Sequence, residues 1–170
     1  MKFLLPWLAA SLIAVGQEIP RAKLVVEDGP APGAVAGEAV SRSMQFRVSG
    51  GEGPVRGTVA ILADQTEDEL LRLTEEKDEW KVPIRVMLFG REGDPSPARS
   101  IVMELFVNDA GYAPRVNVHL GRGLEQERFA NAITSSLILE RSLRGRKAEE
   151  SESPFYVPPW LVDGLREATA

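Results

Sequence analysis

The stretch VPPWLVDGLREA (residues 157–168) lies near the end of a chain of 170 residues and decides which fold we expect. Its two prolines, Pro158 and Pro159, suit the first turn of a helix, where a missing backbone N–H loses no helical partner. The apolar residues that follow have the spacing of a helix with one buried side. We therefore predict a short terminal helix that begins at these prolines.

A longer helix is predicted just before this stretch, from about Glu125 to Arg144. Acidic residues in its first turn and basic residues in its last turn interact favourably with the helix dipole, and Gly145 is a typical helix end. The side that faces the core has six residues at helical spacing: Phe129, Ala132, Ile133, Ser136, Leu137 and Leu143. This apolar side implies that the helix packs against another element.

Several stretches alternate between apolar and polar residues, which predicts half-buried strands. They span residues 43–49, 83–89, 100–107 and 115–120, with a further short edge strand at Leu24–Val26. The first of them turns Met44, Phe46 and Val48 to one face. Turn-forming residues at 90–97 and 108–114 predict hairpins.

The segment from Pro54 to about Glu76 is predicted to be one helix, with Asp64 and Glu67 as solvated outward positions. An alternative is a strand at 55–62 followed by a shorter helix that these two acids cap. The expected fold class is α+β: a small, mostly antiparallel sheet with one covered face, packed against a long helix and a short C-terminal helix.

Residues 1–16 have a positive start at Lys2, an apolar run and small residues before Gly16, as a signal peptide has. The run is too short for a membrane span, which needs about 20 residues. We therefore expect export to the periplasm or the medium, with no membrane span after signal removal. Residues 17–42 are rich in Pro and Gly, which predicts a flexible segment, and residues 43–170 form the folded domain.

The composition narrows the classes of partner. The formal net charge is −5, which disfavours nucleic acid and polybasic membrane binding, because both need a basic surface. The chain has no cysteine, so neither a disulfide framework nor a cysteine metal site is available.

The run PPWLVDGL (residues 158–165) resembles the terminal motif of the peptidase MA-like, gluzincin-type zinc metallopeptidases. In that family a Trp-Leu-x-Glu-Gly-Leu/Phe-Ala helix follows a His-Glu-x-x-His helix. The resemblance implies a zincin-like core, with the motif carried by Trp160, Leu161, Gly164 and Leu165. Asp163 stands where the family has the Glu that is its third zinc ligand. Active relatives continue with further helices, so the resemblance also implies a domain truncated or reduced at its C-terminus.

The long helix departs from that family, because residues 129–141 contain no histidine. Two His one turn apart and an adjacent Glu are what such a zinc peptidase requires. We therefore expect no zinc, an inactive domain, and a vestigial role for Asp163. We interpret Trp160 as a core anchor and Gly164 as a site of close helix approach.

Three functions remain open at this stage. The leading hypothesis is a binding or structural role in the cell envelope, in which an extended peptide or protein lies along an edge strand at 115–120, beside the long helix. A second is a hydrolase with an atypical metal site formed by Asp163, Glu140 and the chain's only histidine, His119. Against it, a lone His reads as a partly solvated strand residue, and Glu140 as a surface ion-pair partner of Arg141 and Arg144. A third is a structural envelope domain without a ligand.

Overall fold

The computed structural model describes residues 23–26, 37–77, 79–108, 111–144, 146 and 157–168. Over these residues the elements run in the order β1 (Lys23–Val26), β2 (Ala39–Val40), β3 (Phe46–Gly50), α1 (Gly53–Thr74), β4 (Ile84–Phe89), β5 (Ile101–Asn108), β6 (Gly111–His119), α2 (Gln126–Leu143) and α3 (Pro159–Glu167). The predicted signal peptide at 1–16 lies outside the described residues. The segment predicted to be flexible, 17–42, contributes the two short strands β1 and β2.

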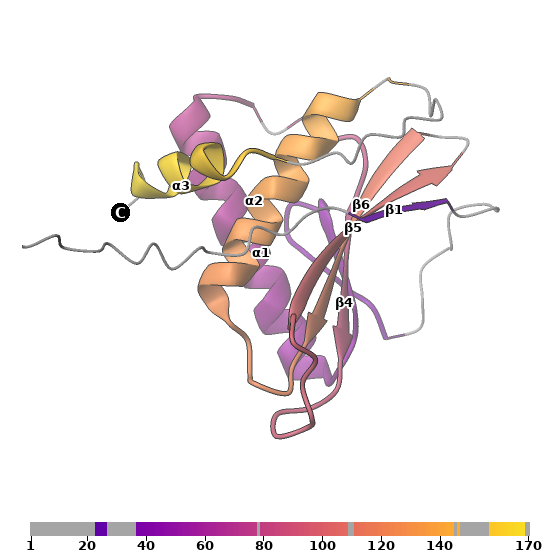
Figure 1. Cartoon of the computed structure of the whole chain (residues 1–170). Coiled ribbons are helices and arrows are strands. Elements are labelled where there is room, and N and C mark those ends of the chain that lie inside the picture. The colour runs from indigo at the N-terminus through magenta and orange to yellow at the C-terminus, as the bar shows by residue number, and fades with distance from the viewer. Residues whose placement is uncertain are drawn as a thin grey trace, which may run out of the picture.

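The strands form one sheet, which lies beside the helices in Figure 1, and their order in it is β1-β5-β6-β4-β3-β2. The pairs β3–β4, β4–β6 and β1–β5 are parallel, and the pairs β2–β3 and β5–β6 are antiparallel. The α+β class is therefore confirmed, but the prediction of a mostly antiparallel sheet is wrong. The reason is the 22-residue helix α1, which carries the chain from β3 back to the start of a parallel neighbour, β4.

One of the two predicted hairpins forms. β5 and β6 pair in antiparallel fashion from Ile101↔Val118 to Asn108↔Gly111, as a hairpin requires. β4 and β5 do not pair, because β6 lies between them in the sheet. The connection at 90–100 therefore passes the position that β6 later fills.

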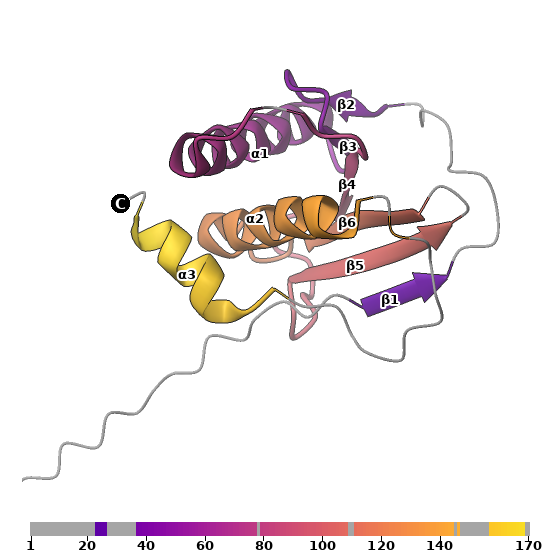
Figure 2. The same ribbon diagram turned by 90° about the horizontal axis from the view of Figure 1, so that it is seen from above.

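All three described helices lie on one side of the sheet, and α1 and α2 cover that face (Figure 2). The main core lies between these two helices and the sheet. Its largest fully buried side chains include Phe46, Ile84, Phe129, Ile133 and Leu137. A second cluster extends the core under α3 and consists of Met103, Leu105, Tyr112, Leu139, Leu143, Val157 and Val162. The predicted core side of the long helix is thus confirmed.

The opposite face of the sheet carries a row of charged residues in register. Arg47, Arg85 and Arg115 lie opposite one another on β3, β4 and β6, and Glu104 of β5 continues the row beside Arg115. Arg47 pairs with Glu38 at 3.5 Å and Arg115 with Glu104 at 2.6 Å. Acidic side chains thus offset the repulsion that like charges on neighbouring strands cause.

Two predictions near α1 are wrong. Met44 is 73% exposed and has a φ of 61°, so it belongs to a turn and the strand begins only at Phe46. Asp64 and Glu67 are buried rather than solvated. Asp64 accepts hydrogen bonds from the amide of Arg42 (2.8 Å) and the hydroxyl of Ser43 (2.7 Å), which holds this turn against α1. The helix runs unbroken to Thr74, so the shorter alternative is also wrong.

Among the described helices, none combines the length and the apolar character that crossing a membrane requires.

Candidate functional site

The strand predicted to receive a peptide at its edge is an interior strand. β6 pairs with β4 on one side, from Arg85↔Arg115 to Phe89↔His119, and with β5 on the other. Strand addition needs an edge with unpaired backbone groups. The predicted path for a peptide along 115–120 is therefore wrong, because both flanks of this strand are already paired.

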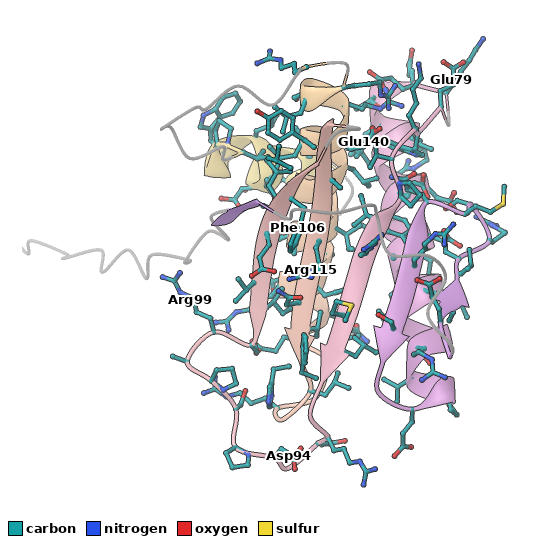
Figure 3. The ribbon with its side chains drawn as sticks, turned by 90° about the vertical axis from the view of Figure 1, so that its right-hand side faces the viewer. Glu79, Asp94, Arg99, Phe106, Arg115 and Glu140 are labelled. Atoms are coloured by element: carbon teal, nitrogen blue, oxygen red, sulfur yellow. The ribbon has the colours of Figure 1, made fainter. Side chains whose placement is uncertain are left out.

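The edge beyond β5 is where an extended segment does bind, and that segment is β1. Four residues pair in parallel, from Lys23↔Glu104 to Val26↔Val107. β1 thus lies opposite half of the eight residues of β5. Figure 3 shows this short strand beside β5, at the rim of the sheet. The outer edge of β5 therefore has the geometry to accept an extended chain.

The open face of the sheet next to this edge is polar and well ordered by side-chain contacts. The Oε2 atom of Glu104 accepts hydrogen bonds from Nε (3.0 Å) and Nη2 (2.6 Å) of Arg115 and from Nδ2 of Asn117 (2.7 Å). The guanidinium of Arg115 also lies 3.9 Å from the ring centre of Phe106, on the neighbouring strand (Figure 3). This set of contacts fixes Glu104 in the row directly beside β1.

The helix-facing side of the same edge is apolar. Leu105 is 1% exposed and belongs to the cluster under α3, while Val107 packs against that cluster and is partly buried. Leu139 and Leu143 of α2 supply the opposite wall of the cluster. A chain added to β5 therefore meets a carboxylate on one face of the sheet and an apolar core on the other.

One side of α2 faces the sheet, and in the resembled family a zinc-binding helix carries its metal ligands on this side. Here the side holds Ala132, Ile133, Ser136 and Leu137, all buried. Ser136 donates its hydroxyl to the carbonyl of Ala132 at 2.8 Å, within the helix. Within the described part of the chain, no three His, Cys, Asp or Glu side chains come together in a metal-binding group. These side chains supply packing and not metal ligands.

α3 packs through Val162 and through only two of its four motif residues, Leu161 and Leu165. Val162 is 5% exposed, and Leu161 and Leu165 pack against the two core clusters. Trp160 is 72% exposed, so its interpretation as a core anchor is wrong. Gly164 is also exposed, and among the described residues nothing lies within 4 Å of a Cβ placed on it, so the predicted close helix approach is wrong. Asp163, the position of the third zinc ligand in the resembled family, is half-buried.

Trp160 and Gly164 are four residues apart and lie on one, exposed, side of the helix. Leu161 and Leu165 are four residues apart on another side, which packs against the core. The register of α3 thus explains both errors.

Glu140 is buried and has a structural role. Its Oε1 atom accepts hydrogen bonds from the amides of Lys81 (3.1 Å) and Val82 (3.2 Å), and Arg144 forms an ion pair with it. The ion pair of Glu140 with Arg144 was predicted, but the predicted surface location of Glu140 is wrong, because its carboxylate is buried. The carboxylate joins α2 to the segment that enters β4.

Arg141 differs from the prediction too, because its ion-pair partner is Glu76 and not Glu140. It lies 4.3 Å from the ring centre of Trp80 and donates to the carbonyl of Lys77 at 2.8 Å. Burial, with a smaller contribution from the nearby charge of Arg144, lowers the pKa of Arg141.

His119 lies at the other end of the sheet, where it is half-buried. Its Nδ1 atom accepts a hydrogen bond from the amide of Gly121 at 3.2 Å. A Cβ on Gly90 would lie 2.8 Å from the ring, so the glycine at this turn makes room for the imidazole. The interpretation of His119 as a partly solvated strand residue is confirmed.

These positions separate the members of the proposed atypical metal site. A Cβ on Gly90 would be within 3.3 Å of both His119 and Asp94, so the histidine is at the Asp94 end of the sheet. Figure 3 shows Asp94 and Glu140 at opposite ends of the molecule. His119 and Glu140 therefore cannot share one metal ion, and the three residues do not converge.

Comparison of the chain with models of known protein families, with curated proteins and with solved structures finds no match in any of the three.

The edge of β5 is the part of the site that sequence reasoning missed. The run Leu24–Val26 was predicted to be an edge strand, but its partner was not identified. An alternating pattern tells which residues share a face, and it does not tell which strand lies next to which.

Proposed function

We propose that this chain is an exported domain of the metallopeptidase-like type that acts by binding and not by catalysis. Its ligand is an extended peptide or protein segment that adds as a strand to the outer edge of β5. The observation that carries the proposal is the parallel pairing of β1 with residues 104–107 of β5. This segment, far away in the sequence, already uses the edge in the way that a peptide ligand would.

The relationship to metallopeptidases is supported by the order of elements. Strand, helix, strands, long helix and terminal helix follow one another over residues 46–167, as in the catalytic core of the resembled family, except that the strand before the long helix is interior here and not at an edge. The terminal helix contains the Trp-Leu-x-Asp-Gly-Leu run. Export is supported by the sequence of residues 1–16.

The proposed lack of catalysis is supported by the composition of α2. A two-histidine zinc site needs imidazoles one turn apart on the side that faces the substrate. The single histidine of the chain is outside this helix, at His119, and the buried acid Glu140 is bound to two backbone amides and Arg144.

A peptide with the sequence of residues 20–29, labelled with a fluorophore, is the direct probe. The protein is the chain of residues 17–170 with Leu24→Pro and Val25→Pro. Because alternate amides of a strand face a given neighbour, two successive prolines remove at least one donor toward β5. We expect saturable binding in fluorescence anisotropy, at least about tenfold tighter than to the unmodified chain, whose tethered β1 competes at a high effective concentration.

A closed form supplies the matched control. Val25→Cys with Phe106→Cys joins two paired residues, and neighbouring strands about 4.8 Å apart are within the range that a disulfide spans. The chain has no other cysteine, so the pair is unambiguous. The oxidised form should bind no peptide. Equal binding to the closed and the proline forms would overturn the proposal, and absence of binding to both would favour a structural domain whose edge β1 fills permanently.

A further inference from the structure

We infer that the edge of β5 selects peptides with a basic residue followed by three apolar residues, bound parallel to β5. The inference rests on the proposed function, because it names the class of ligand for the same edge. It follows from the register of β1 and from the side chains of β5 that lie opposite each of its positions.

The basic position is set by Glu104. Residues that pair across two strands share a face of the sheet, so the residue opposite Glu104 lies on the open face with it. In this chain that position, 23, is a lysine. The carboxylate is held in place by Arg115 and Asn117, so it does not need to be ordered when a ligand binds.

The positive charges farther along the row do not reverse this preference. A residue opposite Glu104 is one strand spacing, about 4.8 Å, from it. The Arg115 guanidinium is bound to Oε2 of the same carboxylate and reaches over Phe106 of β5, although its backbone is two spacings away. Arg85 is a further spacing away. The residue opposite Glu104 has this carboxylate as its direct cross-strand neighbour, where a like charge is destabilising, so a basic residue is favoured over an acidic one.

The apolar positions are set by the next three residues of β5. The peptide residues opposite Leu105 and Val107 face the helix side of the sheet, where Leu105 is part of the core under α3. The peptide residue between these two, opposite Phe106, is on the open face of the sheet, where the aromatic ring and the Arg115 guanidinium form the neighbouring surface. A polar residue at the first of these positions would lose the burial of an aliphatic side chain.

The direction is set as well. β1 runs parallel to β5, and the charged and apolar positions coincide with Glu104 and Leu105 only in that direction. In a peptide of reversed sequence the basic residue would lie opposite Val107 and not opposite Glu104.

The test compares three peptides on the protein with Leu24→Pro and Val25→Pro. The first has the sequence of residues 20–29, the second carries Glu in place of Lys at position 23, and the third carries Ser in place of Leu at position 24. We expect the Glu peptide to bind about fivefold more weakly and the Ser peptide about tenfold more weakly than the first. With Glu104→Gln added to the protein, the first two peptides should bind about equally.

The outcomes separate this inference from the proposed function. If none of the peptides binds, strand addition at β5 is wrong. If the Lys and Glu peptides bind equally to the protein that keeps Glu104, strand addition stands and the selection by charge is wrong. Should Glu104→Gln weaken the fold, salt titration of the protein with Glu104 decides: the preference for Lys must shrink as salt rises, while the preference for Leu must not.

Discussion

The two edges of the sheet are closed by short strands in different ways. At one edge, β2 pairs with β3, which follows it in the sequence, and the turn between them is held by Asp64. At the other edge, β1 pairs with β5, and three strands and a helix separate the two in the sequence. Figure 2 shows the two edge strands at opposite rims of the sheet.

The difference is in how each strand is fixed. The turn before β3 is bound to α1 by a buried carboxylate, and Ala39 packs against the main core, so β2 is part of the fold. β1 is joined to β5 through backbone pairing over four residues. Single elements of a fold can open locally, at a lower free energy than the fold as a whole. We propose that one edge is closed by the fold and that the other is closed by a segment that a ligand replaces.

Replacing the anchor of the β2 edge should have the largest effect. In Asp64→Ala the amide of Arg42 and the hydroxyl of Ser43 lose their acceptor, so we expect the free energy of unfolding to fall by about 2–3 kcal/mol in urea titration. Asp68→Ala is the control, since Asp68 forms an exposed ion pair with the same arginine and should change stability far less. If the two substitutions lower the free energy of unfolding equally, Asp64 does not fix this edge.

Opening the β1 edge should have an intermediate effect. With Leu24→Pro and Val25→Pro, the free energy of unfolding should fall by about 1 kcal/mol, because four residues of edge pairing are lost and the core is retained. Circular dichroism and urea titration measure this directly. A loss as large as that of Asp64→Ala would mean that β1 is as much a part of the fold as β2.

The smallest effect is expected at an exposed residue of α3, a third peripheral element. Trp160→Ala should change the free energy of unfolding by less than about 0.5 kcal/mol, because the ring is 72% exposed. Val162→Ala, at a buried position of the same helix, should cost about 1–2 kcal/mol. If the tryptophan variant is the less stable of the two, the register of α3 described above is wrong.

The helices were predictable from the sequence because their signals are local. The spacing of Phe129, Ile133 and Leu137 and the prolines at 158–159 depend only on neighbouring residues. The strand at Leu24–Val26 was predicted for the same reason.

The arrangement of the sheet was not predictable in this way. β6 lies between β4 and β5, although β5 comes before it in the chain, and only this order makes β6 an interior strand. Burial of polar groups was missed for a related reason. Asp64 and Glu140 are acids on helices, and their burial depends on backbone amides at Arg42, Lys81 and Val82 that come from other parts of the chain.

Amide hydrogen exchange of residues 104–107 tests the central claim most directly. It is measured on the protein with Leu24→Pro and Val25→Pro, with and without the peptide of residues 20–29. We expect the outward-facing amides of these residues to lose protection when β1 is released and to regain it when the peptide binds, while the amides of β2 and β3 do not change. Binding of the peptide without renewed protection at β5, or with new protection at the β2 edge, would contradict it.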